Sequence, residues 1–145
     1  MEAKCNKEHL LNFIKDYFYA FNAMDGDAYL KLWKEDGRLI NVGNSGKFLY
    51  RSPEDFAKAL AKWKDMEVDF TCQMQEEPHS RIVDGLVASI EVRYNMIMPE
   101  SIGEHTSFFH LICDEGQWKI TSLMDRGFEK MNEAEAQSEM EAVSN

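Results

Sequence analysis

The stretch HTSFFHLICDEGQWKITSLMDRGF, residues 105–128, predicts two long β-strands joined by a tight turn. Apolar and aromatic residues run through both halves, and Asp114-Glu115-Gly116 between them contains residues that tolerate turn conformations. The same pattern precedes this stretch, because residues 81–83 and 86–98 flank Asp84-Gly85, a dipeptide that suits a two-residue hairpin turn. The second half of the chain therefore predicts an antiparallel sheet.

Further strands are expected upstream. Between residues 66 and 75, apolar and polar side chains alternate, which predicts a half-buried strand that begins at Met66. Two short apolar runs, residues 39–42 and 48–50, flank Gly43-Asn44-Ser45-Gly46 and predict a pair of strands joined by a turn.

Helices are expected before and between these strands. Apolar residues recur at steps of three and four from Leu10 to Met24, which predicts a helix that begins near the capping residue Asn6. Asp25 then caps a second, shorter helix, which we expect to carry Leu32 and Trp33.

Ser52-Pro53 starts a third helix, since serine caps helices and proline fits their first turn. Helices separated from an antiparallel sheet define an α+β fold. The sequence therefore predicts three N-terminal helices packed on a curved antiparallel sheet.

Composition limits both organisation and partners. The chain has 145 residues, of which 44% are hydrophobic, and this suffices for one core. We expect a single domain over residues 1–128 and an acidic tail over residues 129–145. Sixteen basic against 26 acidic residues leave a net charge of -10, which opposes binding to nucleic acid. No apolar run is long enough to span a bilayer and no signal peptide is evident, so we expect a cytoplasmic protein without membrane contact.

Cysteine and histidine spacing gives no sign of a metal or cofactor. Cys5, Cys72 and Cys113 are odd in number and widely spaced, unlike a disulfide framework or a zinc site. We expect Cys72 and Cys113 to be core thiols. Because no glycine-rich phosphate loop follows a strand either, the sequence predicts neither a cofactor nor a metal.

Three segments resemble one known superfamily: YFYAFNAMD at residues 17–25, LWKEDG at 32–37 and DEGQWKI at 114–120. They are similar to the nuclear transport factor 2-like superfamily, also called SnoaL-like or ketosteroid-isomerase-like, and the resemblance covers residues 8–128. It implies a cystatin-like cone that encloses a pocket. It does not define an activity, because the superfamily includes isomerases, dehydratases, epoxide hydrolases, polyketide cyclases and members without chemistry.

The resemblance suggests three candidate catalytic residues. Tyr17 matches the tyrosine with which ketosteroid isomerases stabilise an enolate. Asn41 matches a water-positioning asparagine of limonene epoxide hydrolases, and Asp125 matches one of their two catalytic aspartates. Both comparisons are incomplete, since the isomerase base falls at Asn41, an amide, and the hydrolase arginine and aspartate are replaced by Glu91 and Arg93.

Each candidate has a structural alternative. Tyr17 also fits a core aromatic, and Asn41 also fits a local turn contact. His105 resembles a histidine of scytalone dehydratases, yet a surface histidine at a loop-to-strand junction has the same sequence signature. Asp125 shares a face with Leu123, but the opposite set is more apolar and would turn Asp125 outward to pair with Arg126 at the surface. The resemblance favours the pocket for Asp125.

Two functions remain open. The first is an uncharacterised pocket protein that binds a small, mainly apolar molecule, and the second is a cofactor-free acid-base enzyme of epoxide hydrolase, dehydratase or isomerase type. Both faces of the last strands are partly apolar, so we also expect a homodimer that packs sheet against sheet. The residues expected to line the pocket are Phe21, Trp33, Phe56, Trp63, Tyr94, His105 and Phe109.

Overall fold

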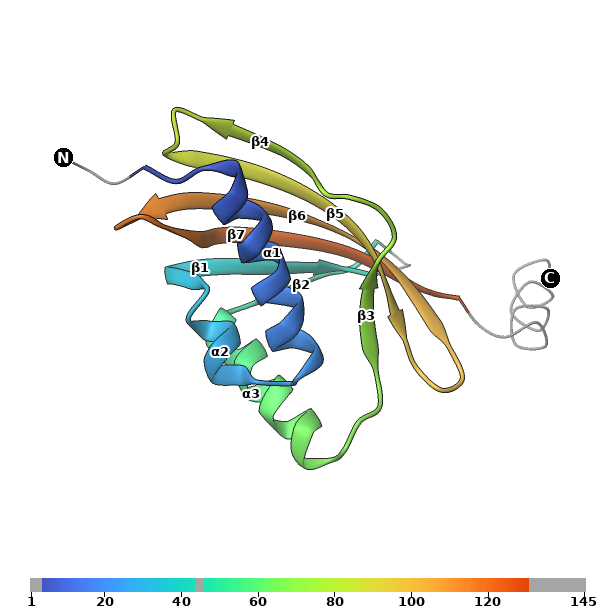
Figure 1. Ribbon diagram of the computed structural model, residues 1–145. Helices are drawn as coiled ribbons and strands as arrows, with labels where there is room; N and C mark the ends of the chain where they lie inside the picture. The colour runs from blue at the N-terminus through green and yellow to red at the C-terminus, as the bar shows by residue number, and fades with distance from the viewer. Residues whose placement is uncertain (1–3, 44–45, 131–145) are drawn as a thin grey trace.

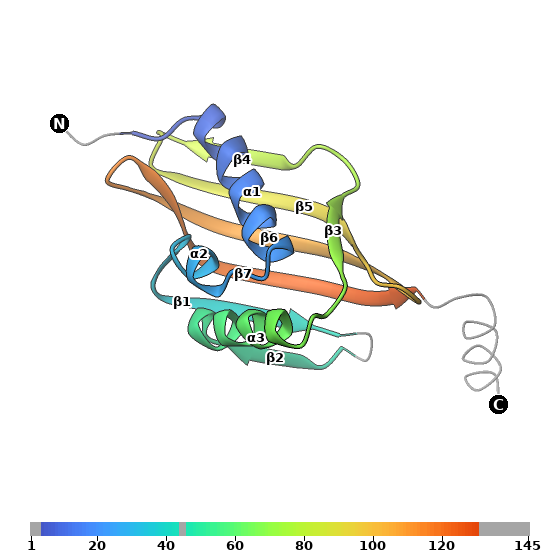
Figure 2. The ribbon, with the colours of Figure 1, turned by 60° about the horizontal axis from the view of Figure 1, so that its bottom comes forward.

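A seven-stranded sheet, strongly bent, carries all the helices on one face (Figures 1 and 2). The computed structural model describes residues 4–43 and 46–130, with side chains as far as residue 127. It is an α+β structure, as predicted. The elements in chain order are α1 (Lys7–Asn22), α2 (Gly26–Leu30), β1 (Trp33–Val42), β2 (Phe48–Arg51), α3 (Pro53–Asp65), β3 (Thr71–Met74), β4 (His79–Val83), β5 (Val87–Ile97), β6 (Ile102–Asp114) and β7 (Gln117–Lys130).

The helices begin where the capping residues predict. The side chains of Asn6, Asp25 and Ser52 accept hydrogen bonds from backbone N–H groups in the first turns of α1, α2 and α3. Only α1 and α3 are sizeable, because α2 has five residues. The prediction that the second helix carries Leu32 and Trp33 is wrong: Trp33 begins β1, where it pairs with Ile120 of β7. Pairing with the sheet overrides a weak local helical pattern at this point.

The strand order is β2-β1-β7-β6-β5-β3, with β4 paired to β5. Both predicted hairpins are confirmed, and their turns contain pairs of residues with positive φ angles, namely Asp84-Gly85 and Glu115-Gly116. The prediction of a wholly antiparallel sheet is wrong at one place, because β1 and β7 run parallel, whereas every other pair among the described strands is antiparallel. The strand predicted from Met66 is shorter than expected, because Met66 caps α3 and is 63% exposed, and β3 begins at Thr71.

A β-bulge in β7 resolves the conflict between the two sets of apolar residues in that strand. Leu111 lies opposite Ile120, but His110 lies opposite Ser122, so that Thr121 is an extra residue. The extra residue reverses which side chains point inward. Ile120 before the bulge is therefore buried, and so are Leu123 and Asp125 after it.

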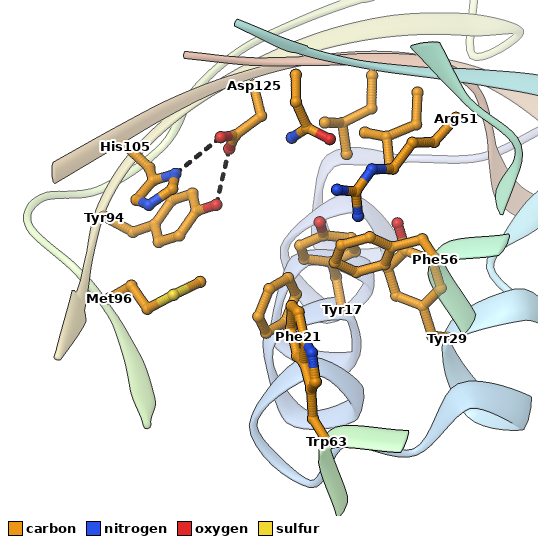
Figure 3. Close-up of a pocket in the computed structure, with 13 residues that line it drawn as sticks. Tyr17, Phe21, Tyr29, Arg51, Phe56, Trp63, Tyr94, Met96, His105 and Asp125 are labelled. Carbon is orange, nitrogen blue, oxygen red and sulfur yellow. Dashed lines mark hydrogen bonds and ion pairs between the residues drawn. The ribbon is translucent and has the colours of Figure 1, made fainter. Parts of the chain in front are cut away.

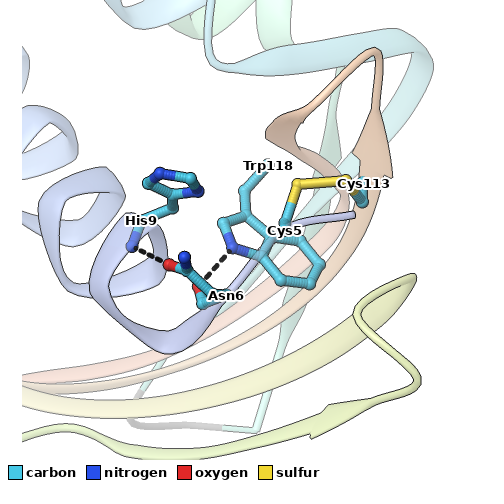
Figure 4. Close-up of a disulfide and its surroundings, with 5 residues drawn as sticks. All are labelled: Cys5, Asn6, His9, Cys113 and Trp118. Atoms are coloured by element: carbon cyan, nitrogen blue, oxygen red, sulfur yellow. Dashed lines mark hydrogen bonds between the residues drawn. A yellow bond between two sulfur atoms is a disulfide. The ribbon is translucent and has the colours of Figure 1, made fainter. Parts of the chain in front are cut away.

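Cys5 and Cys113 form a disulfide, with their Cα atoms 5.8 Å apart (Figure 4). The expectation that Cys113 is a core thiol is therefore wrong, while Cys72 is a buried free thiol. The pairing could not be predicted because 108 residues separate the two cysteines. They meet because the segment before α1 crosses the sheet: the Cys5 N–H donates to the Gly85 carbonyl, and Trp118 Nε1 donates to the Asn6 carbonyl.

No helix among the described residues is long and apolar enough to cross a membrane. Residues 129 and 130 of the predicted acidic tail belong to β7, and the rest of that tail, residues 131–145, lies outside the described residues.

Candidate functional site

A pocket of about 190 Å³ lies between the helices and the covered face of the sheet (Figure 3). Its walls come from distant parts of the chain, because all three described helices and five strands each contribute side chains. Most of the lining is aromatic or aliphatic, with polar groups at a few positions. The lining residues are Tyr17, Phe21, Tyr29, Leu39, Asn41, Arg51, Phe56, Trp63, Tyr94, Met96, His105, Leu123 and Asp125.

Asp125 is the polar centre of this pocket. It is 6% exposed, and its carboxylate contacts three polar side chains. Its Oδ2 accepts hydrogen bonds from the Tyr94 hydroxyl at 2.7 Å and the Ser107 hydroxyl at 2.5 Å. Its Oδ1 lies 2.7 Å from His105 Nδ1. Because an ionised carboxylate can only accept hydrogen bonds, this contact assigns a proton to Nδ1 of the imidazole.

Strand register brings these four side chains together. Ser107 lies directly opposite Asp125 across the β6–β7 pair, and Asn41 is the partner of Asp125 across the parallel β1–β7 pair. Two residues along β6, His105 lies opposite both Tyr94 and Gly127. Side chains at such positions point to the same side of a sheet.

Gly127 provides the space that His105 occupies. A methyl group at this position would overlap the imidazole at Cε1 and Nδ1. On its other side the imidazole stacks on the Tyr94 ring, with ring centroids 4.9 Å apart and planes inclined by 16°. The ring is thus fixed between β5 and β7, and its Nδ1 is directed at Asp125.

His105 also borders a second hollow of about 380 Å³, which it shares with Asn41, Met96 and Asp125. Its side chain is 19% exposed. Since Nδ1 is engaged by Asp125, Nε2 is the ring nitrogen left to act on a bound molecule.

The pocket tyrosines are neutral hydrogen-bond donors. Burial raises the pKa of Tyr17 well above its ordinary value, and neighbouring phenols add to this effect. Burial, followed by the negative charge of Asp125, raises the pKa of Tyr94 in the same way. Both hydroxyls therefore keep their protons at neutral pH.

The three predicted catalytic residues, Tyr17, Asn41 and Asp125, all line this one pocket. Among the predicted ligand-binding residues, Phe21, Phe56, Trp63, Tyr94 and His105 line it as well.

Trp33 and Phe109 are buried in the core behind the pocket and do not line it. Phe109 packs edge-on against Tyr17, and Trp33 packs against Tyr29. The alternative predictions that His105 and Asp125 lie on the surface are wrong, because both side chains lie in the pocket wall. Arg93 does not line the pocket and pairs with Glu76 at 3.8 Å.

Sequence reasoning missed Ser107, Arg51 and Gly127. Ser107 shares the strand parity of His105 and could have been found once the inward face of that strand was assigned. Arg51 follows the short run 48–50 directly, but nothing in the sequence shows where its side chain points. Gly127 shares strand parity with Asp125, but its contact with the His105 ring depends on a cross-strand neighbour and could not be predicted.

A bent sheet wrapped around helices, with a pocket between them, defines the nuclear transport factor 2-like or cystatin-like class, and solved structures of this class superimpose on the chain. A domain of unknown function with a cystatin-like fold from Nostoc punctiforme is 15% identical, with 96% of this chain and 86% of that chain covered at a TM-score of 0.66. A nuclear transport factor 2-like protein from Shewanella baltica is 16% identical, with coverage of 83% and 91% and a TM-score of 0.61. A candidate scytalone dehydratase from Novosphingobium aromaticivorans is 16% identical, with coverage of 83% and 82% and a TM-score of 0.69.

The model of the SnoaL-like domain matches residues 10–124, and the chain belongs to this family. A search of curated protein sequences finds no match. Likeness at these identities shows the fold alone, so the activity has to be argued from the site.

Proposed function

We propose that the pocket binds a small, mainly apolar molecule and that His105, held by Asp125, transfers a proton to or from it. The observation that carries the proposal is the 2.7 Å contact between Asp125 Oδ1 and His105 Nδ1 in the pocket wall. A carboxylate that accepts the Nδ1 proton fixes the tautomer in which Nε2 is basic, and it stabilises the imidazolium that forms after proton transfer.

The remaining polar groups have supporting roles. Tyr94 and Ser107 donate to Asp125 Oδ2 and hold the carboxylate in place. These two bonds, together with the contact to His105, leave Asp125 a positioning residue behind the imidazole. The neutral hydroxyl of Tyr17 is suited to donate a hydrogen bond to an oxygen of the bound molecule.

Acid-base chemistry of the isomerase or dehydratase kind fits this arrangement better than epoxide hydrolysis. The hydrolase-like set would require Glu91 and Arg93 at the pocket, whereas neither lines it. An imidazole beside an apolar cavity suits removal of a proton from a carbon next to a carbonyl group, followed by its return or by loss of a leaving group. All the groups in this scheme belong to the chain, so the proposed proton transfer uses no group from a cofactor.

Solvent exchange of a simple carbon acid tests the proposal without knowledge of the substrate. Phenylacetone in D₂O buffer exchanges the CH₂ protons between ring and carbonyl, and proton NMR follows the loss of their signal. We expect the protein to accelerate exchange and His105→Gln to reduce the acceleration on the order of a hundredfold or more. His9→Gln is the matched control, because His9 is an exposed histidine on α1.

Two results would count against the proposal in different ways. Exchange that continues in His105→Gln at the wild-type rate removes His105 as the base. If phenylacetone binds but its exchange is not accelerated, the protein binds small molecules without transferring a proton.

We further propose a homodimer through the face of the sheet that the helices leave uncovered. Phe108 and Met124 lie side by side there and are 43% and 45% exposed, and Val87 lies beside Ile112 with exposures of 47% and 36%. Association would bury these side chains. In sedimentation at micromolar concentration, we expect a dimer that Phe108→Asp converts to a monomer, whereas Tyr19→Asp, on exposed α1 surface, does not. A wild-type monomer would rule this out.

A cytoplasmic location stays a prediction. The disulfide argues against it, because such bonds persist mainly in oxidising compartments. Fractionation of cells that express the chain, with the state of Cys5 and Cys113 trapped by alkylation, tests location and disulfide together.

A further inference from the structure

Of the described residues that line the pocket, Arg51 is the one whose charge has no role in the proposed proton transfer. It is the last residue of β2 and partly buried. Figure 3 shows its side chain reaching into the pocket, with the guanidinium directed toward the rings of Tyr17 and Phe56. Among the described residues no carboxylate forms an ion pair with it.

Asp125 does not serve as its counter-charge. Both oxygens of that carboxylate are engaged, by Tyr94, Ser107 and His105. Arg51 lies opposite Leu39 of β1, and Asp125 lies opposite Asn41 of the same strand. The two charged residues are thus two strands and two positions apart, roughly 12 Å between Cα atoms for ordinary sheet spacing.

Other polar atoms in this wall also lack partners. The Tyr29 hydroxyl and Asn41 Oδ1 are buried in the pocket lining and form no hydrogen bond with any described residue. A hydroxyl can donate, and a side-chain amide can turn over to present its NH₂ group. The guanidinium of Arg51 is permanently charged and lies in an aromatic pocket whose lining offers further potential donors. Its N–H groups lack an anionic acceptor in this pocket until an anion binds.

We infer that Arg51 selects an anionic ligand, and that the molecule taken by this pocket is a small carboxylic acid with an apolar body of about one ring. The guanidinium matches a carboxylate with two parallel hydrogen bonds. A monoanion is favoured over a phosphate dianion because Asp125 adds negative charge to the same pocket. The size follows from the volume, since a cavity of roughly 150 Å³ accommodates benzene and this pocket has about 190 Å³.

The inference adds a ligand class to the proposed function. It rests on the first part of that function, namely that the pocket binds a small molecule. With the carboxylate on Arg51, the apolar body extends across Tyr17 and Phe56 toward the far wall. Its other end is then placed at His105. The reacting carbon would accordingly lie several bonds from the carboxylate, on the opposite side of the ring.

Phenylacetate and phenylacetamide, which have the same shape and differ in charge, test the inference. Their dissociation constants can be measured from tryptophan fluorescence, because Trp63 lines the pocket, and checked by calorimetry. We expect phenylacetate to bind the wild type more tightly than the amide, on the order of tenfold to a hundredfold. Arg51→Gln should abolish this preference, with the larger loss of affinity for phenylacetate. Arg81→Gln, at an exposed arginine of β4, should preserve it.

Equal affinities for the two compounds, or a preference that survives Arg51→Gln, would overturn the inference and leave the pocket function intact. Failure of both compounds to bind at 10 mM would overturn it as well. The exchange experiment with phenylacetone distinguishes failure of this inference from failure of the proposed function. If exchange depends on His105 but phenylacetate binds no more tightly than phenylacetamide, only the role of Arg51 is wrong. Arg51→Lys keeps the positive charge but lacks the planar guanidinium. An intermediate preference for phenylacetate in this variant would support two parallel hydrogen bonds between Arg51 and the carboxylate.

Discussion

Breaking the disulfide should cost the protein a large part of its stability. The bond joins Cys5 to Cys113 across 108 positions of sequence. In the chain-entropy model, closing a loop of this size in the unfolded state stabilises the folded protein by about 4.7 kcal/mol at 25 °C. Measured losses for native disulfides are about 2 to 5 kcal/mol, so we expect 3 to 5 kcal/mol here.

Urea denaturation followed by circular dichroism measures this loss in two independent ways. Addition of a phosphine reductant to the wild type should lower the free energy of unfolding by that amount and raise the denaturant slope, because the reduced unfolded chain is more expanded. Cys5→Ala, Cys113→Ala and the double variant should be about equally stable, since one substitution already removes the bond. Cys72→Ala is the control, and its response to the reductant should match that of the wild type.

Two results would refute this reasoning. The first is an unfolding transition that the reductant leaves unchanged. The second is a count of three free thiols in the unreduced, denatured protein, where the disulfide leaves one.

Three further predictions concern buried groups. Gly127→Ala should displace the His105 ring and cost about 1–3 kcal/mol of unfolding free energy, and phenylacetone exchange should fall at least tenfold; unchanged exchange would contradict the placement of the ring. Stability should fall as the pH rises above about 10, by up to about 1.4 kcal/mol per pH unit for each tyrosine, because Tyr17 and Tyr94 keep their protons when folded but lose them when unfolded. Urea titrations from pH 8 to 11 measure this slope, and a flat profile would be inconsistent with buried phenols. Burial raises the pKa of Cys72 to about 12, so its thiol should react with a disulfide reagent at pH 8 only after unfolding.

Sequence reasoning succeeded for the elements whose signals are local. Asn6, Asp25 and Ser52 cap helices at the expected positions, and Asp84-Gly85 forms the expected turn. Each of these signals lies within a few residues of the structure that it determines. Trp33 failed for the opposite reason, because its strand conformation depends on pairing with Ile120.

The site required long-range information. The parity of β7 changes at Thr121, so alternation read along the whole strand gave two conflicting faces. The resemblance favoured the face that contains Asp125, and the bulge is the physical reason that Ile120 before it and Leu123 and Asp125 after it are all buried. The partnership of Asp125 with His105 was not predicted, since it depends on the register of β6 against β7.

The position of β7 has a consequence for synthesis on the ribosome. Within the described residues, β7 lies between β1 and β6, and it alone joins the β2–β1 pair to the β6–β5–β3 portion of the sheet. It is also the last of these strands to be translated, and it lies beyond Cys113, outside the loop that the disulfide closes. Before residues 117–130 leave the exit tunnel, the nascent chain can form only two separate sheet fragments, each with an unpaired edge. The sheet should therefore form only after β7 has emerged, and chaperones that cover exposed strand edges should associate with the chain until β7 is inserted.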